Sequence, residues 1–258
     1  MAKRRKSSWM NRLLQQVIRF FVPKQIRSKM GWFWFGSTRL GTSLVGGFLA
    51  LVMLFSVLPV PYSAYMLQQK VYHLFAGERY DIQKKWVSLD QIAWQMQMAV
   101  IASEDQTFES HFGIDLNAIQ RAFIRNGKSK KVVGASTISQ QTVKNMFLWH
   151  GQSWIRKGIE LPMTLVVENV WGKERILEVY LNVAEFGDGI FGVEAAARHF
   201  FNKSASQLSL QEAALLSASL PNPQVYRVNK PGPTMRKRQA WIMRQVNNLG
   251  GKNYLEKL

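Results

Sequence analysis

Residues 88–106 read SLDQIAWQMQMAVIASEDQ, and this stretch determines the fold that we expect for the chain. Ser88 and Gln91 stand at the spacing of a capping box, in which two side chains close the amino-terminal end of a helix. The side chains that follow at helical spacing on one face are Ile92, Met96, Ala99, Val100 and Ser103. The stretch therefore predicts a helix packed by one face, with Glu104 at its end.

Helical spacing continues after this stretch, and alternating strand patterns or hairpin turns are not apparent. Asp115 can cap a helix over 116–125. Ser209 and Glu212 form a second capping box in front of the helical sequence EAALLSASL. We therefore expect an all-α domain.

Acidic side chains are scarce in this chain, yet they gather near the end of the first helix. The 258 residues include 34 Lys and Arg against 16 Asp and Glu, which gives a net charge of +18. Four of the acids lie close together: Glu104, Asp105, Glu109 and Asp115. A net charge of this size predicts an anionic partner, such as nucleic acid, an acidic membrane surface or a phosphorylated substrate. The acidic cluster is either solvated surface or a site that needs carboxylates.

The amino-terminal region has the pattern of a basic tail followed by a membrane anchor. No Asp or Glu precedes Glu78, whereas ten Lys and Arg lie within residues 1–39. The next charged residue is Lys70, and residues 41–58, GTSLVGGFLALVMLFSVL, are almost entirely apolar. This stretch, with the residues that flank it, predicts one transmembrane helix over residues 40–65.

The distribution of charge predicts the orientation of this anchor. Basic residues crowd its amino-terminal flank, so the positive-inside rule puts residues 1–39 in the cytoplasm and residues 66–258 outside it. A buried core helix and a cleaved signal peptide are the alternatives, but the long preamble is unusual for a signal peptide. Within the tail, residues 11–22 fit either a helix on an anionic leaflet or a poorly ordered arm.

Several kinds of site are not expected from this sequence. There is no cysteine, which excludes disulfides, thiolate metal sites and a catalytic cysteine. Gly127-Lys128-Ser129 suggests a phosphate-binding loop, but the pattern needs a glycine where Ala122 stands. The four histidines are scattered without a His-Glu-x-x-His pattern, so zinc is improbable, and no Ser-x-x-Lys pattern indicates an acyl-serine enzyme.

Five segments resemble a known family. In order they are ASEDQTFESHFGID (102–115), GASTISQQTVKNMF (134–147), RKGIE (156–160), KERILEVYLNVAEFGDGIFGVEAAARHFF (173–201) and LSLQEAALLSASLPNP (208–223). They resemble the five motifs of the peptidoglycan glycosyltransferases of family 51. The resemblance covers about residues 85–225.

The resemblance implies a lysozyme-like helical domain over residues 66–258, outside the inner membrane in the periplasm. It implies a reaction in which lipid II, a disaccharide-pentapeptide on undecaprenyl pyrophosphate, is polymerised with inversion into β-1,4 glycan strands. A divalent cation, Mg²⁺ or Mn²⁺, is expected on the pyrophosphate, and no organic cofactor. The expected partners are lipid II, the growing strand, the membrane and cell-wall synthesis or division proteins, but not nucleic acid. No penicillin-binding domain is expected after Pro223.

The resemblance also implies roles for individual residues. Glu104 matches the general base that removes a proton from the attacking sugar hydroxyl. Glu160 matches a second important glutamate, which positions the groups around the pyrophosphate. The implied substrate-binding residues are Asp105, Phe108, His111, Gly134, Ser136, Thr137, Gln140, Gln141, Lys144, Arg156 and Lys157.

Two positions depart from the family pattern. Gln152 stands where members often carry an arginine, and Pro162 follows Glu160 at a distance that favours a kink or helix boundary. Two other functions remain as alternatives. One is a membrane-anchored, lysozyme-like enzyme that cleaves glycan strands, which would not need Lys144, Arg156 and Lys157. The other is an anchored scaffold or nucleic-acid binder that uses the basic tail.

Overall fold

The computed structural model describes residues 12, 15–16, 20, 28–128, 134–151 and 153–258. It divides into two compact units, Met1–Leu54 and Phe55–Leu258. Gln152 and most of the amphipathic pattern in residues 11–22 lie outside the described residues, so those two predictions remain predictions.

The first unit contains most of helix α2 (Lys29–Phe55), which is 27 residues long. Its mean hydropathy is 1.6, and by length and composition it is the one described helix able to cross a membrane. At 1.5 Å per residue it extends over about 40 Å. The predicted bounds, 40–65, were wrong for the helix. It begins earlier because KMGWFWFG continues it, and it ends before Pro59 and Pro61, which cannot extend a helix.

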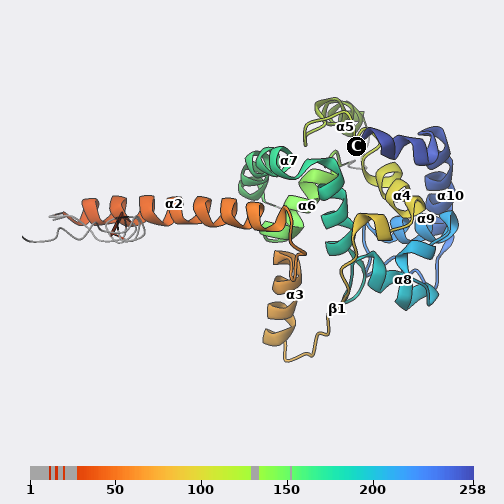
Figure 1. Cartoon of the computed structure of the whole chain (residues 1–258), viewed down its shortest axis with the longest axis horizontal. Helices are drawn as coiled ribbons and strands as arrows, with labels where there is room; N and C mark the ends of the chain where they lie inside the picture. The colour runs from red at the N-terminus through yellow and green to blue at the C-terminus, as the bar shows by residue number, and fades with distance from the viewer. Residues whose placement is uncertain (1–11, 13–14, 17–19, 21–27, 129–133, 152) are drawn as a thin grey trace, which may run out of the picture. The chain divides into compact units, whose positions relative to one another are not determined.

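The second unit is built mainly of helices (Figure 1). They are α3 (Ala64–Phe75), α4 (Trp94–Glu104), α5 (Leu116–Lys128), α6 (Ile138–Phe147), α7 (Trp154–Val183), α8 (Val193–Phe201), α9 (Leu210–Ser219) and α10 (Pro233–Asn248). The described residues of this unit also include three short 3₁₀ helices: η1 (Leu89–Gln91), η2 (Ala205–Gln207) and η3 (Gly251–Lys257). The helical class expected from the sequence is confirmed.

Helix α4 lies at the centre of the core and packs against α9, α10 and η3. Its side chains from Met98 to Ala102 are completely buried, not only those on one face. Burial of each large apolar side chain contributes about 1.5–3 kcal/mol to folding. The helix is thus fixed on all sides, and its last residue, Glu104, is held in a defined place.

The three predicted helix caps are all present, but one of them closes a different helix from the one expected. The capping box of Ser88 and Gln91 is present, but it closes η1, and α4 begins only at Trp94. Asp115 caps α5 as predicted, because its Oδ1 accepts a 2.7 Å hydrogen bond from the Ala118 amide. The box of Ser209 with Glu212 opens α9, also as predicted.

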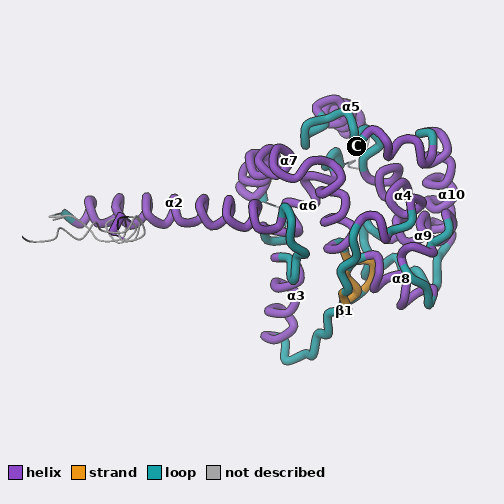
Figure 2. Tube along the Cα trace, in the orientation of Figure 1, coloured by secondary structure: helices purple, strands orange, loops and turns teal. Residues whose placement is uncertain are grey.

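A small sheet escaped prediction from the sequence (Figure 2). Its strands are β1 (Gln83–Lys84), β2 (Glu185–Gly187) and β3 (Ile190–Phe191), in the order β1-β3-β2. β3 pairs parallel to β1 and antiparallel to β2, with a bulge in β2. Strands of two or three residues are too short to produce an alternating pattern.

Helix α7 breaks at Gly172 and not at Pro162, so the expected kink was misplaced. Gly172 has φ 69° and ψ 173°, a conformation that is nearly restricted to glycine. Pro162 lies inside the regular part of the helix. Because proline has no amide hydrogen, the carbonyl of Gly158, four residues earlier, lacks its usual helical hydrogen bond. The half of α7 that carries Glu160 is therefore continuous through the proline.

A second strained glycine leads to a prediction about stability. Gly192 has φ 81° and ψ 150°, and an added Cβ would lie 2.8 Å from the carbonyl oxygen of Asn182. Gly192→Ala is expected to lower the free energy of unfolding by about 4 kcal/mol, because backbone strain and a steric clash add. Gly172→Ala is the matched control, since its backbone is similarly strained but its Cβ meets nothing within 4 Å. Urea unfolding measures the free energy of unfolding of both variants. Equal losses would show that the steric clash at Gly192 does not contribute.

Candidate active site

Glu104 ends α4 and receives hydrogen bonds from two other helices. Gln141 of α6 donates from Nε2 to Glu104 Oε2 at 3.1 Å. Arg238 of α10 donates from Nη2 to Glu104 Oε1 at 3.2 Å. Tyr180 in turn donates its hydroxyl to Gln141 Oε1 at 3.1 Å, which fixes the Gln141 amide with its NH₂ toward Glu104. The carboxylate is thereby oriented by side chains from α6, α7 and α10.

Asp105 and His111 lie next to Glu104 but are buried. Asp105 accepts a bond of 2.9 Å from His111 Nε2 and one of 2.9 Å from the Ile138 amide. The second bond joins the end of α4 to the start of α6. Lys173 of α7 donates a bond of 2.6 Å to the His111 carbonyl and so fixes the position of His111. Asp105 and His111 therefore hold the end of α4, and with it Glu104, in place against α6 and α7.

Glu160 stands at the centre of a group of cations. It accepts a bond of 2.6 Å from Arg156 Nη1 and one of 2.5 Å from Lys157 Nζ, and its side chain is only 3% exposed. Lys144 of α6 lies close enough to interact electrostatically with all three. We call Lys144, Arg156, Lys157 and Glu160 the cation cluster. Three positive charges against one negative charge leave an excess that suits a polyanion.

Lys144 is strongly influenced by its surroundings. Burial lowers the pKa of its ammonium group below the ordinary value, and the neighbouring charges of Arg156 and Lys157 lower it further. Glu160 and Glu104 act in the opposite direction. Lys144 is thus a poorly hydrated cation between the two carboxylates that the sequence predicted to be functional. Such a cation interacts with an arriving anion more strongly than a hydrated one does.

A cavity of about 270 Å³, which we call the inner cavity, is lined by residues from both groups. Gln141 and Tyr180, the residues that orient Glu104, line one part of it. Lys144 lines another part, together with Glu185 and the Pro221–Gln224 segment. The residues that orient Glu104 and one cation of the cluster, Lys144, therefore line the same cavity.

Three predicted binding residues are buried away from this hollow. Phe108 is 0% exposed, Gln140 1% and Thr137 2%. Thr137 and Gln140 form the capping box of α6, and the Thr137 hydroxyl donates to the Gly113 carbonyl at 2.6 Å. Their prediction as direct substrate contacts is corrected, because burial keeps all three from the surface: the Thr137 hydroxyl and the Gln140 Oε1 are bonded within the chain, whereas the Gln140 Nε2 is buried without a partner among the described residues. Gly134 and Ser136 are exposed, and Ser136 accepts a 3.4 Å bond from Lys157.

Arg238 was not predicted from the sequence. It lies in MRKRQAW (235–241), a basic run with the appearance of a solvated helix face, and beyond the segments that resemble the family. No local signal distinguishes it from Arg236 or Lys237. Only the packing of α10 against α4 brings it to Glu104.

His150, also not predicted, lies beside the cation cluster and leads to a prediction about pH. Its ring stacks on Tyr65 with centroids 3.8 Å apart. Burial, together with the nearby charges of Lys144 and Arg156, lowers the pKa of His150 to about 4. Between pH 6.5 and 4 the unfolded chain binds more protons at this residue, so the folded state loses stability as the pH falls.

His150→Phe keeps the stacked ring but removes the proton-binding group. The melting temperature of the wild type is expected to fall more steeply than that of the variant from pH 6.5 to 4. Differential scanning calorimetry in detergent measures both curves. Parallel curves would show that His150 is not the source of the difference.

The described residues contain no group of three or more His, Asp or Glu side chains that could hold a metal ion. The carboxylates of the site are already paired, Glu104 with Arg238 and Glu160 with Arg156 and Lys157. These residues do not fit a resident metal, and no step of the mechanism below depends on one.

One oriented carboxylate next to a group of cations is the arrangement of an enzyme that transfers a sugar from a phosphate-linked donor. Comparison with known proteins agrees with this class. Residues 69–247 match the Transglycosylase family, and the chain belongs to that family.

The chain is similar to several proteins named biosynthetic peptidoglycan transglycosylase. The one from Mannheimia succiniciproducens is 58% identical over 215 residues, which cover 83% of this chain and 88% of the relative. The one from Haemophilus influenzae is 60% identical over 203 residues, 78% of this chain and 82% of the relative. The one from Salmonella typhimurium is 54% identical over 206 residues, 79% and 85%.

Proposed function

We propose that this protein polymerises lipid II into β-1,4-linked glycan strands and releases undecaprenyl pyrophosphate, as a step of cell-wall synthesis. The observation that carries the proposal is the inner cavity, which has the partners of Glu104 on one side and Lys144 on the other. Membership of the transglycosylase family supports it. The reaction needs both groups, because a hydroxyl must lose a proton while a pyrophosphate gains charge.

Glu104 is the general base of the proposal. The acceptor hydroxyl attacks the anomeric carbon of the donor and loses its proton to this carboxylate. Attack on the face opposite the leaving pyrophosphate inverts the configuration, without a covalent sugar intermediate. Gln141 and Arg238 hold the carboxylate in position, so that little side-chain entropy is lost when the substrates bind.

The cation cluster receives the leaving group. As the bond between sugar and phosphate breaks, negative charge moves onto the pyrophosphate, and preorganised cations lower the energy of that state. Arg156 and Lys157 are oriented by their hydrogen bonds to Glu160. Glu160 thus acts as a positioning residue. An enzyme that only cleaves glycan strands would have no use for this group.

A divalent cation, Mg²⁺ or Mn²⁺, belongs to the proposal as a part of the substrate. Pyrophosphate oxygens are the hard ligands that these ions prefer. The ion would arrive on the donor and add its charge to that of the cation cluster. Activity is then expected to fall with a chelator and to return with either ion.

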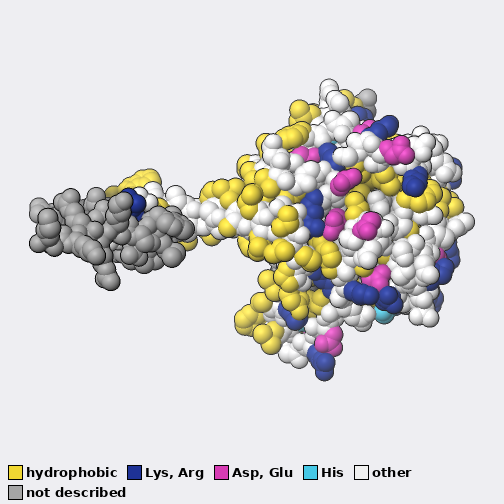
Figure 3. Space-filling view, in the orientation of Figure 1, with side chains coloured by type: hydrophobic (Ala, Val, Ile, Leu, Met, Phe, Trp, Pro, Cys, Tyr) yellow, Lys and Arg dark blue, Asp and Glu magenta, His cyan; other side chains and the backbone are white. Residues whose placement is uncertain are grey.

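The membrane arrangement is also proposed. Helix α2 is the anchor, residues 1–39 face the cytoplasm, and residues 66–258 lie on the periplasmic side of the inner membrane. On α3, Leu67, Val71, Leu74 and Phe75 are exposed, and apolar side chains gather over this helix (Figure 3). They would favour contact with the leaflet that contains the lipid-linked substrate. Cell-wall synthesis or division proteins are candidate partners at the same surface.

Because the chain has no cysteine, single introduced cysteines can report the topology. Cysteines at Ser7 and at exposed Lys252 should react differently with an impermeant maleimide added to spheroplasts. Labelling at Lys252 alone supports the proposed orientation. Labelling at Ser7 alone would reverse it.

The product decides between the proposed function and glycan cleavage. Purified protein in detergent, with labelled lipid II and Mg²⁺, is expected to produce long strands that lysozyme degrades. Incubation with preformed strands is the second arm. Shortened strands in that arm, with lipid II unchanged in the first, would establish the cleaving enzyme instead.

A further inference from the structure

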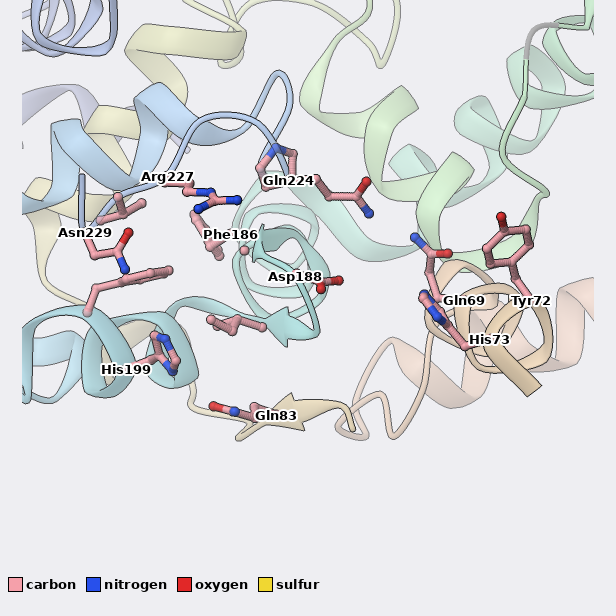
Figure 4. Close-up of a pocket in the computed structure, with 15 residues that line it drawn as sticks. Gln69, Tyr72, His73, Gln83, Phe186, Asp188, His199, Gln224, Arg227 and Asn229 are labelled. Carbon is pink, nitrogen blue, oxygen red and sulfur yellow. The ribbon is translucent and has the colours of Figure 1, made fainter. Parts of the chain in front are cut away.

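A second and larger cavity, of about 730 Å³, lies beside the inner cavity. We call it the outer cavity. Figure 4 shows its walls: α3 on one side, the small sheet and α8 on the other, and the segment that contains Gln224, Arg227 and Asn229 above them. Pro223 and Gln224 line both cavities. A single ligand of sufficient length can therefore occupy the two together.

The outer cavity combines charges of both signs. Arg227 and Asp188 line it, and both are exposed. Among the residues that the structure describes, neither forms an ion pair. Four amide side chains also line the cavity: Gln69, Gln83, Gln224 and Asn229. The cation cluster, by contrast, has a large excess of positive charge, so the two regions suit different chemical groups.

This composition fits a peptide better than a sugar or a phosphate. A neutral sugar needs no unpaired Arg and Asp, and a polyanion would be repelled by Asp188. A peptide with a carboxylate end and an amino group needs one partner of each sign, and amides that pair with its backbone. Arg227 supplies the cation and Asp188 the anion.

The wall formed by α3 is held in place by contacts on its inner side. His73 stacks on Tyr80 with ring centroids 4.4 Å apart and an interplanar angle of 4°. The Tyr80 hydroxyl accepts a bond of 3.1 Å from the Gly189 amide, in the turn next to Asp188. Tyr65 donates a bond of 2.8 Å to Glu185 of β2. The cavity is therefore preformed, which lowers the entropic cost of binding.

We propose that the outer cavity binds the peptide branch of the substrate, with a carboxylate at Arg227 and an amino group at Asp188. This inference rests on the proposed function, since the peptide is a part of lipid II. The sugars would occupy the inner cavity near Glu104, and the peptide would extend past Gln224. The site then recognises the substrate by its peptide as well as by its pyrophosphate.

The test compares lipid II that carries its full peptide with lipid II whose peptide is cut back to one residue. The wild type is expected to show a KM about a hundredfold lower for the full peptide, because the charge-assisted contacts at Arg227 and Asp188 contribute about tenfold each. Arg227→Ala is expected to raise the KM for the full peptide about tenfold. The KM for the short peptide, and kcat for both substrates, should stay within about twofold of the wild-type values. Arg244→Ala, which removes an exposed arginine of α10 outside both cavities, is the control.

A second arm tests the amino group. Asp188→Asn should weaken binding of the full peptide, but it should have no further effect once the amino group of that peptide is acetylated. Equal KM values of the wild type for full and short peptides would overturn the proposal, as would a loss in Arg227→Ala that is equal for both. Failure of the wild type to polymerise either substrate would refute the proposed function itself.

Discussion

Glu104→Gln is expected to reduce the rate of lipid II polymerisation about 10³-fold, with little change in KM. Glutamine has nearly the same shape, and its one oxygen can still accept the bond from Arg238, although its NH₂ group then faces the NH₂ of Gln141 and that bond is lost. It cannot accept the proton of the attacking hydroxyl. The loss therefore falls on the chemical step, which single-turnover rates with excess enzyme measure directly.

Glu109→Gln is the matched control for this experiment. Glu109 belongs to the same acidic stretch, but it accepts a hydrogen bond from the Tyr254 hydroxyl of η3, whereas Glu104 is bonded to Gln141 and Arg238. Its replacement is expected to leave the rate within about twofold, because no transition-state charge depends on it. If Glu104→Gln retained a tenth of the wild-type rate, the role of general base would have to be given to another group.

Glu160→Gln is expected to lower kcat about 10²-fold through the leaving group. The variant keeps all three cations but loses the carboxylate that aligns Arg156 and Lys157. These side chains would then turn toward solvent, and the developing pyrophosphate would find fewer preorganised partners. A lipid donor with a better leaving group should recover much of the loss, because it depends less on the cations.

Glu194→Gln separates this effect from simple destabilisation. Glu194 is also 3% exposed and also pairs with an arginine four residues away, Arg198, but on α8. Both variants are expected to lower the melting temperature, since each disrupts a buried ion pair. Only Glu160→Gln should lower kcat. Equal kcat losses would mean that Glu160 acts through the fold and not through the cation cluster.

Local features of the site could be predicted from the sequence. Asp115 and the pair of Ser209 and Glu212 are caps in the structure because capping depends on residues within one turn. The spacing of Arg156, Lys157 and Glu160 likewise predicted that the three side chains meet on one face of a helix. Glu104 could be placed at the end of a helix, since both the helix and its end are local features.

Features that depend on tertiary packing could not be predicted in this way. Arg238 reaches Glu104 across 134 positions of sequence, and nothing in its own neighbourhood marks it. Phe108 and Thr137 lie in the segments that resemble the family, yet both are buried. A motif indicates which residues belong to a site, but burial decides which of them support it and which can contact a ligand.

The turn of α7 that carries Arg156, Lys157 and Glu160 lacks one of the backbone hydrogen bonds of a regular helix, because Pro162 has no amide hydrogen. Gly158 has the greatest backbone freedom of any residue, and Pro162 leaves its carbonyl without the usual amide donor. This turn can therefore deform at a smaller free-energy cost than a regular helical turn can. Such compliance suits groups that must follow a phosphate as it moves away from the sugar. Helix α4, which carries Glu104, is completely buried from Met98 to Ala102 and is rigid by comparison, so the general base is held more firmly than the groups that receive the phosphate.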